Sequence, residues 1–361
     1  MLGTTWTIVD DFQLVAGEHS NPSGLATAAP NTIYAVGVAR QNTFNWHVRR
    51  SVDGGANWED VDTMSGGASE VVVAPNGNVF VVGTSNTDRL VRRSVDGGDS
   101  WETVDTVPLS PGACSAGSLV VASDGTVYVG GGCDLDGLLV RRSTDGGDTW
   151  EDVDTFIFEN GAASRMGTLG IDANDRVYAG GNGSELDGVL HWIVRSGTES
   201  GSWTTVDDFQ LAAGSNATSN GFGGRTAIYA AGYARDASFN FHWIVRRADI
   251  ADPTAWTTVD DLGAADAIEE REARSLYEDP MGTFIVAGNV LPNGGVSRAI
   301  FRRSEDGMSW QDMGEYNYVT DKPSSAVGNL VADAAGNVYG MIRGVDANDT
   351  AHWIVRKLGC E

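Results

Sequence analysis

The feature that most constrains this chain is an eight-residue motif, Ser-x-Asp-Gly-Gly-x-x-Trp, which returns about every fifty residues along the 361-residue sequence. It is complete at Ser51–Trp58, Ser94–Trp101 and Ser143–Trp150, and one residue shorter at Ser304–Trp310. Degenerate copies end at Trp203 and Trp256, and Trp6 begins a copy whose upstream half is missing. Seven copies at this period are typical of a β-propeller, whose blades repeat every about 40 to 50 residues, and not of a helical solenoid.

Each period carries the signals of four short strands. In the second period we expect strands at Glu70–Val73, Val79–Val82, Leu90–Arg93 and Trp101–Asp105, with a tight Asn-Gly turn after the first. The sequence therefore predicts an all-β fold with a single domain over residues 1–361, built as a seven-bladed β-propeller of four-stranded antiparallel blades. The predicted blades span residues 24–63, 70–106, 115–156, 165–208, 222–261, 272–313 and 326–357, and residues 4–10 complete the last one.

The two ends of the chain predict how the ring closes. The last period has strands around Leu330, at Val338–Ile342 and at His352–Arg356, and then stops without a fourth strand. The N-terminal segment Thr5–Asp10 reads as a fourth strand with no blade of its own. Pairing the two would seal the ring and hide strand edges that otherwise invite aggregation.

The repeated motif resembles the Asp box, or BNR repeat, of sialidases, xyloglucan hydrolases, sortilin-type receptors and photosystem assembly factors. The resemblance implies that the motif lies on the hairpin between the third and fourth strands, at the blade periphery. There the Ser and Asp side chains would hydrogen-bond the turn's own backbone, and the Trp would pack beneath it. The residues that the resemblance assigns to this structural role are Ser51, Asp53, Trp58, Ser94, Asp96, Trp101, Ser143, Asp145, Trp150, Ser304, Asp306 and Trp310.

The chemistry of the sialidases does not follow from the same resemblance. Those enzymes use an arginine triad, with a Phe/Tyr-Arg-Ile-Pro segment near the start, a Tyr/Glu pair and an acid/base Asp, and they resemble six-bladed propellers. No Arg-Ile-Pro segment occurs here, and most arginines fall in a Val-Arg-Arg repeat on the third strands. We expect these arginines to be structural, opposite acidic residues of the fourth strands and stacked on the motif tryptophans.

The charge of the chain excludes several partners. Asp and Glu number 49 against 24 Lys and Arg, for a net charge of −25. This balance argues against a nucleic-acid or anionic-lipid surface, and no apolar run is long enough to predict a membrane span. Only Lys322 and Lys357 are lysines, which suits a salty or extracellular setting and equally a GC-rich genome.

A second repeated pattern supplies the candidate ligand-binding residues, at the start of the third strands. They are Trp46, His191, Trp192, His242, Trp243, His352 and Trp353, with Asn45 before the tryptophan of the first blade. Polar–aromatic pairs repeated around a ring are typical of sugar-stacking sites. The alternative is that each Trp wedges between neighbouring blades while each His caps a strand end, and the sequence favours this reading.

No motif identifies catalytic residues. Arg225, Tyr229, Tyr233, His242, Arg274 and Tyr277 would be available for the His/Tyr/Arg set of a polysaccharide lyase, and the many carboxylates for a glycosidase pair. Nucleophile elbows, phosphate loops and His-metal motifs are absent from the sequence. The oxygen-rich loops Asp134–Gly137, Glu185–Gly188 and Asp346–Asp349 suit Ca²⁺ but fit no EF-hand pattern, so we expect solvated turns and no cofactor.

The cysteines indicate the redox state of the compartment in which the protein folds. Folding the hairpin of the third blade on Asp124-Gly125 brings Cys114 opposite a position close to Cys133, which predicts a disulfide and an oxidising compartment. Cys360 is a free tail thiol in this interpretation. The strand pattern starts at the N-terminus with no secretory leader before it, so an extracellular or cell-surface location implies a mature chain.

Taken together, these patterns predict a monomeric, non-catalytic binding propeller that recognises a glycan or a protein at its loop face. The regular repeat, the periodic His-Trp pairs and the lack of catalytic motifs favour it. A glycoside hydrolase or polysaccharide lyase of Asp-box type is the alternative, and an assembly scaffold or receptor module is the third hypothesis.

Overall fold

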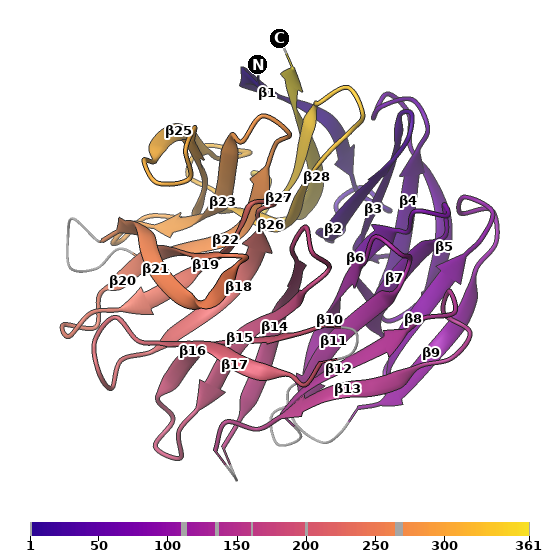
Figure 1. Ribbon diagram of the computed structural model, residues 1–361. Coiled ribbons are helices and arrows are strands. Elements are labelled where there is room, and N and C mark those ends of the chain that lie inside the picture. Colours follow the sequence, from indigo (N-terminus) through magenta and orange to yellow (C-terminus); the bar gives the residue numbers. More distant parts are fainter. Residues whose placement is uncertain are drawn as a thin grey trace.

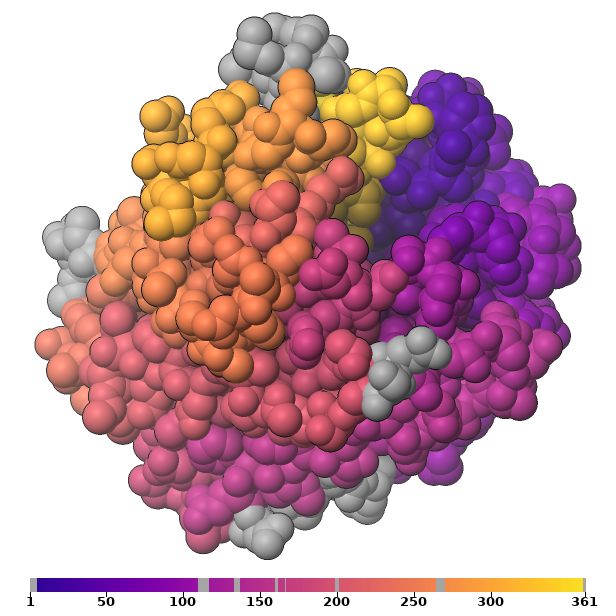
Figure 2. All heavy atoms as spheres, in the orientation of Figure 1, coloured from indigo at the N-terminus to yellow at the C-terminus, as the bar shows by residue number. Residues whose placement is uncertain are grey.

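The computed structural model describes residues 2–109, 114–133, 137–159, 162–198, 201–263 and 270–360. Seven four-stranded sheets surround a central axis as the blades of a propeller (Figure 1). The chain visits them in order, so the colours in Figure 2 run around the disc until the yellow C-terminal strand lies beside the indigo N-terminal segment. The predicted all-β, seven-bladed fold is confirmed.

The strands are numbered in chain order, and each blade is named by its place in the sequence. Blades 1 to 3 contain β2 (Ser20–Ala28), β3 (Thr32–Arg40), β4 (Phe44–Ser51), β5 (Glu59–Ser65), β6 (Gly67–Val73), β7 (Val79–Thr84), β8 (Asp88–Ser94), β9 (Glu102–Pro108), β10 (Cys114–Val121), β11 (Val127–Cys133), β12 (Gly137–Ser143) and β13 (Glu151–Phe156). Blades 4 and 5 contain β14 (Ser164–Ile171), β15 (Val177–Ser184), β16 (Leu190–Gly197), β17 (Thr204–Phe209), β18 (Ala217–Gly223), β19 (Ala227–Arg235), β20 (Phe241–Asp249) and β21 (Asp252–Leu262). Blades 6 and 7 contain β22 (Glu270–Glu278), β23 (Phe284–Leu291), β24 (Arg298–Ser304), β25 (Gln311–Tyr316), β26 (Ser324–Ala332), β27 (Val338–Val345), β28 (Ala351–Cys360) and β1 (Leu2–Phe12).

The N-terminal strand closes the ring as the sequence predicts. The last sheet has the order β1-β28-β27-β26, with Trp6 opposite Leu358 and Phe12 opposite Trp353. The two chain ends therefore lie side by side (Figure 1). A blade built from both ends cannot detach without breaking a strand pair, which stabilises the ring and covers the last edge.

Each blade is a meander of four strands, which we call A to D from the axis outward. Because the strands alternate in direction, the B–C and D–A connections lie at one end of the axis and the A–B and C–D turns at the other. We call the first end the loop face. Strands such as β3 and β7 are buried along nearly their whole length, because each sheet packs on a blade at either side. The hydrophobic clusters accordingly join adjacent blades, as Trp46 of blade 1 joins Val71 and Val81 of blade 2.

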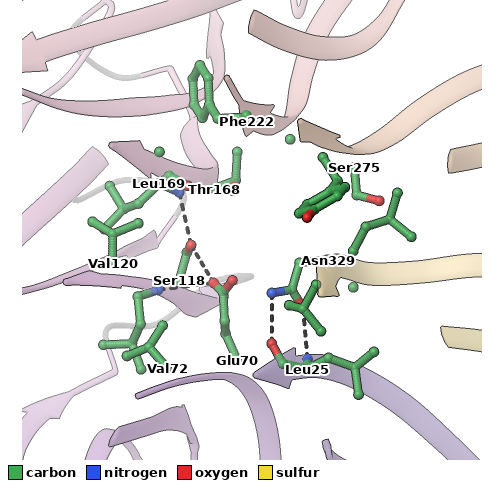
Figure 3. A pocket seen from close by; sticks show the side chains of 18 of the residues that line it. Leu25, Glu70, Val72, Ser118, Val120, Thr168, Leu169, Phe222, Ser275 and Asn329 are labelled. Carbon is green, nitrogen blue, oxygen red and sulfur yellow. Dashed lines mark hydrogen bonds between the residues drawn. The ribbon is translucent and has the colours of Figure 1, made fainter. Parts of the chain in front are cut away.

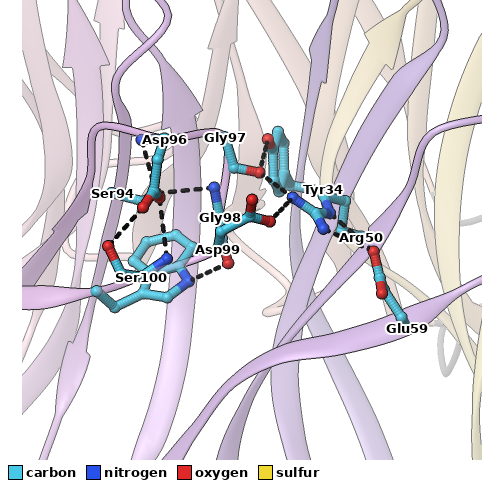
Figure 4. Close-up of polar contacts among 10 residues, drawn as sticks. Tyr34, Arg50, Glu59, Ser94, Asp96, Gly97, Gly98, Asp99 and Ser100 are labelled. Atoms are coloured by element: carbon cyan, nitrogen blue, oxygen red, sulfur yellow. Dashed lines mark hydrogen bonds and ion pairs between the residues drawn. The ribbon is translucent and has the colours of Figure 1, made fainter.

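The repeated Ser-x-Asp-Gly-Gly-x-x-Trp motif forms the C–D turn. In blade 2 the Ser94 hydroxyl donates to Asp96 at 2.8 Å and accepts the Gly98 amide at 2.7 Å, and Asp96 accepts the Ser100 amide at 2.9 Å (Figure 4). Hydrogen bonds from Ser100, and then from Ser94, lower the pKa of Asp96 to about 2. Gly97 and Gly98 have φ angles of 73° and 98°, a region that favours glycine.

Arginines of the C strands tie each blade to its neighbours. In blades 1 and 2 the second Arg of Val-Arg-Arg pairs with a D-strand glutamate of its own blade and reaches the next C–D turn, as Arg50 does with Glu59 and Asp99 (Figure 4). The first Arg forms an ion pair with a D-strand aspartate of the preceding blade, and in the fork of Arg246 and Asp207 both bonds are 2.7–2.8 Å long. Six junctions have this arginine–aspartate ion pair, and we call the six pairs the outer belt: Arg49–Asp10, Arg92–Asp62, Arg141–Asp105, Arg195–Asp154, Arg246–Asp207 and Arg302–Asp260. The pairs of Arg92, Arg195, Arg246 and Arg302 are forks with two hydrogen bonds.

The junction of blades 6 and 7 departs from this pattern. Gly314 occupies the position of the D-strand aspartate, since it pairs with Phe301 as Asp260 pairs with Val245. Arg356, the arginine of that junction, lies over the Tyr316 ring at 3.9 Å and donates to the Trp6 carbonyl oxygen at 3.1 Å. The expected contact of these arginines with motif tryptophans is found for Arg49 over Trp58 and Arg356 over Trp6. Elsewhere another aromatic ring lies under the arginine, as Phe209 does under Arg246.

Candidate functional site

The central channel is a cavity of about 700 Å³ lined by the seven A strands. Its wall carries apolar side chains, among them Val72, Val120 and Phe222, and a ring of seven positions at the bulges of the A strands, of which five are polar and two are glycine (Figure 3). Gly24, Glu70, Ser118, Thr168, Gly221, Ser275 and Asn329 occupy these positions. We call this ring the inner belt.

Polar side chains of the inner belt bind the backbone of the next blade. Glu70 accepts the Leu119 amide at 3.0 Å, Ser118 accepts the Leu169 amide at 2.9 Å, and Asn329 exchanges two 2.8 Å bonds with Leu25 (Figure 3). Ser118 also donates to Glu70 at 2.5 Å. Burial raises the pKa of Glu70 to about 7 although both bonds oppose the shift. These groups satisfy one another and join blades, so the channel wall offers few free polar groups to a ligand.

The four tryptophans of the predicted sugar-stacking sites are fully buried. Trp46, Trp192, Trp243 and Trp353 each have 0% exposed surface. Their rings fill space left by Gly83, Gly232, Gly288 and Gly37 of the next blade's B strand, where a Cβ atom would clash with them. No indole face is open to a sugar in this structure, so the stacking interpretation has to be corrected in favour of wedges between blades. A glycine at the matching B-strand position was the sequence signal for this.

The three histidines of the same pattern are each held between carboxylates at the loop face. His191 contacts Asp208 at 2.7 Å and Glu185 at 2.9 Å. His242 contacts Asp261, and His352 contacts Asp11, each at 2.6 Å. Burial lowers the pKa of His191, but the two carboxylates outweigh it and the pKa is raised. The same arrangement in three blades indicates a strap between the start of strand C and the end of strand D.

A pocket of about 230 Å³ opens on the loop face across blades 5 to 7, and we call it the loop-face pocket. Its lining consists of Tyr233, Phe241, Glu270, Glu272, Arg274, Asn289, Leu291, Ser297 and Ser325. Arg274 also lines the central channel, so the pocket adjoins the channel mouth. The lining residues lie at or next to the loop-face ends of A, B and C strands. Because these ends are adjacent in neighbouring blades, residues of three blades meet in one pocket.

The two sides of this pocket differ in chemistry. On blade 5 the rings of Tyr233 and Phe241 lie 5.2 Å apart, and the Arg235 guanidinium covers the Phe241 ring at 4.2 Å. On blade 6 Glu272 accepts hydrogen bonds from Arg274 at 2.8 Å and from Asn220 at 2.9 Å. Aromatic rings that share a pocket with carboxylate, amide and hydroxyl groups are an arrangement that binds small polar ligands with apolar faces.

The Arg, Tyr and His residues considered for a polysaccharide lyase lie in different parts of the structure. Tyr233 and Arg274 line the loop-face pocket, whereas Arg225 and Tyr277 line the channel. Tyr229 is buried, and His242 is held by Asp261. Sequence reasoning missed Phe241 and Glu272. No repeated motif includes Glu272, and Phe241 has a counterpart in Phe44 at the same register position of blade 1, so the sequence alone does not tell the two phenylalanines apart.

Other predicted sites are only partly described. The backbone register places Cys114 directly opposite Cys133 in β10 and β11, while the side chains of both cysteines lie outside the described part of the structure, so the disulfide stays a prediction. Residues 134–136 are also outside it. The other two loops use their acids internally, since Glu185 binds His191 and Asp346 accepts backbone amides. Among the described residues no cluster of three or more His, Cys, Asp or Glu side chains is arranged to hold a metal ion.

Comparison with known proteins identifies the fold class. Neither the known protein families nor the curated proteins contain a match to this chain. Among solved structures, an ulvan lyase bound to -[GlcA(1-4)Rha3S]- has a TM-score of 0.61 and 10% identity, covering 96% of this chain and 95% of the lyase. YCF48 from Cyanidioschyzon merolae has a TM-score of 0.57 and 13% identity over 98% of both chains. A Hadza microbial sialidase has a TM-score of 0.51 and 14% identity, over 86% and 73%.

The chain is thus a seven-bladed β-propeller whose fold is similar to those of the ulvan lyase, YCF48 and the sialidase. At these identities the likeness concerns the fold alone. Within the described residues, none of the secondary structure is a helix of the length and apolarity that crossing a bilayer requires.

Proposed function

We propose that this propeller binds a glycan at the loop-face pocket. The observation that carries the proposal is that the paired rings of Tyr233 and Phe241 line one pocket together with Glu272 and Asn289. Sugar rings present an apolar face of C–H groups, which packs on aromatic rings, and a rim of hydroxyls, which carboxylates and amides bind. The pocket provides both on strands held rigidly by packed blades, and rigid presentation limits the entropy lost on binding.

The charge of the pocket favours neutral sugars or amino sugars. Glu270 and Glu272 line it, and the one arginine of the lining, Arg274, is already paired with Glu272. The whole chain adds a net charge of −25, which repels polyanions over the Debye length. We therefore expect oligosaccharides of glucose, N-acetylglucosamine or glucosamine to bind more tightly than oligogalacturonate.

Isothermal titration with these four oligosaccharides tests the proposal. Phe241→Ala is expected to weaken the tightest of them by about tenfold, as for loss of an aromatic hot spot. Phe44→Ala is the matched control, because Phe44 pairs with Arg40 in blade 1 as Phe241 pairs with Arg235 in blade 5. Phe44 is outside the pocket, so its variant should bind like the parent chain. Absence of binding by all four sugars, or equal losses in both variants, would contradict the proposal.

An enzymatic role is the second candidate, since Glu272, Tyr233 and Arg274 share the pocket with a carboxylate at Glu270. Paired carboxylates and a tyrosine suit general acid–base chemistry on a glycan. The same oligosaccharides, incubated with the protein and assayed for new reducing ends or unsaturated products, separate the two functions. Product formation that is lost in Glu272→Gln would replace the binding role with a catalytic one.

A further inference from the structure

The same five-residue turn recurs at hairpins on both faces of the propeller. In each copy the first residue's amide donates to the fifth residue's carbonyl oxygen, and the fourth residue's amide donates back to the first residue's carbonyl oxygen. This is a type I turn closed by a residue with positive φ. In the described part of the chain the fourth residues with these two bonds are Gly77, Gly125, Asp175, Gly188, Phe239, Gly282, Gly336 and Asp349.

Phe239 is the exception in this set. Its φ is 63°, a conformation that glycine adopts freely, that Asp tolerates, and that is an outlier for a bulky side chain. The turn leaves it no alternative, because Asp236 accepts the amides of Ser238 and Asn240 at 2.8 and 2.9 Å and the Asn240 side chain at 3.0 Å. The backbone at this position would be more relaxed with glycine.

Packing within the chain does not explain the phenylalanine either. Its side chain is 64% exposed at the tip of the β19–β20 hairpin, on the loop face. Two residues later on the same hairpin, Phe241 lines the loop-face pocket beside Tyr233. A bulky side chain at a strained backbone position that stays mostly exposed in the free protein indicates a contact with another molecule.

We propose that Phe239 is a third aromatic contact of the glycan site, extending the platform of Tyr233 and Phe241 beyond the pocket to a neighbouring sugar of a chain. This rests on the proposed function and adds to it that the ligand is an oligosaccharide of more than one residue. The pocket of about 230 Å³ holds little beyond a single ring, and Phe239 supplies the next subsite. Backbone strain at the turn then persists because it positions a ligand-binding ring.

Two variants of this residue separate the strain from the binding. Phe239→Gly relaxes the turn, so its thermal midpoint should lie above that of Phe239→Ala and at or above that of the parent chain. Both variants should bind the tightest oligosaccharide of the titration series about fivefold more weakly, and the corresponding monosaccharide equally well. Leu186→Ala is the matched control, because Leu186 is 68% exposed in the same turn of blade 4, away from the pocket. It should change neither affinity.

Each outcome decides the inference. Unchanged oligosaccharide affinity in Phe239→Gly, together with a loss in Phe241→Ala, overturns the role of Phe239 and leaves the proposed function standing. A melting midpoint of Phe239→Gly no higher than that of Phe239→Ala removes the argument from strain. If the parent chain binds none of the sugars, the proposed function falls, and this inference falls with it.

Discussion

The blades are joined twice, and the two belts that join them use different chemistry. In the outer belt six junctions repeat one arginine–aspartate ion pair, which is a two-bond fork at four of them, whereas in the inner belt Glu70, Ser118 and Asn329 each bind the next blade in their own way. Each outer-belt junction buries the charges of an arginine and an aspartate, and two buried charges are tolerated only when they are paired. The inner belt needs only an acceptor for a backbone amide, and a carboxylate, a hydroxyl or an amide serves equally.

The largest effect is expected from breaking one outer fork. Arg246→Ala leaves Asp207 buried without its partner, which is expected to cost about 3–5 kcal/mol of unfolding free energy. Replacing both members, as Arg246→Met with Asp207→Leu, removes both charges and should cost much less than the single change. Chemical denaturation of the two variants measures the difference. A double variant as unstable as the single one would show that the fork contributes by attraction and not by mutual neutralisation.

The contrast between the belts also explains what the sequence could predict. Repeated residues predict the blade count, the closure by Thr5–Asp10 and the pairing of Val-Arg-Arg. They do so because equivalent contacts in successive blades require the same residue types. The expected pairing within a blade is found, as between Arg141 and Asp152. The second partner was not predicted, since Arg92 reaches Asp62 in the preceding blade and a hairpin argument considers only the strands of one blade. The inner belt was not predicted at all, because its members share a function and not a residue type.

The candidate site was hidden for the same reason. The periodic His-Trp pairs indicate sugar-stacking sites as one interpretation of the sequence, but residues repeated in this way serve packing between blades. Trp243, for example, is buried against Gly288. Tyr233 was noted only within a wider set, and Phe241 and Glu272 escaped notice. The proposed site differs from the rest of the ring by its combination of residues, since Phe241 by itself has a counterpart in Phe44 of blade 1. Without the fold to bring blades 5 to 7 together, single residues carry no pattern.

A second prediction concerns the inner belt and its dependence on pH. Burial raises the pKa of Glu70 from 4.5 to about 7, so the folded state holds a proton that the unfolded state releases. The stability contributed by the protonated form is therefore complete below the unfolded pKa and is lost as pH rises through the folded one. Glu70→Gln keeps an oxygen to accept from Ser118 and Leu119 and cannot ionise. Relative to the parent chain, it should gain on the order of 2 kcal/mol of stability from about pH 5 to about pH 9.

Asn329→Ala provides the comparison for that experiment. It removes two inner-belt bonds to Leu25 and no ionisable group, so its destabilisation should be the same at both ends of the pH range. Denaturant unfolding at a series of pH values measures both variants. If the difference between Glu70→Gln and the parent chain is constant across the series, Glu70 is ionised throughout and the inner belt, like the outer one, contains a buried charge.

The smallest effect is expected at the junction of blades 6 and 7, where the outer belt is interrupted. No carboxylate among the described residues lies within ion-pair distance of Arg356, and burial lowers its pKa. Arg356→Met retains apolar contact with Tyr316 and removes an uncompensated charge, so it should change stability by less than about 1 kcal/mol, against 3–5 kcal/mol for Arg246→Ala. Gly314→Asp should not restore a fork, because φ at Gly314 is 109° and strains any residue with a Cβ atom. If Arg356→Met loses as much unfolding free energy as Arg246→Ala, the Tyr316 side chain replaces the missing aspartate in full. The propeller would then have seven equivalent junctions between blades and not six.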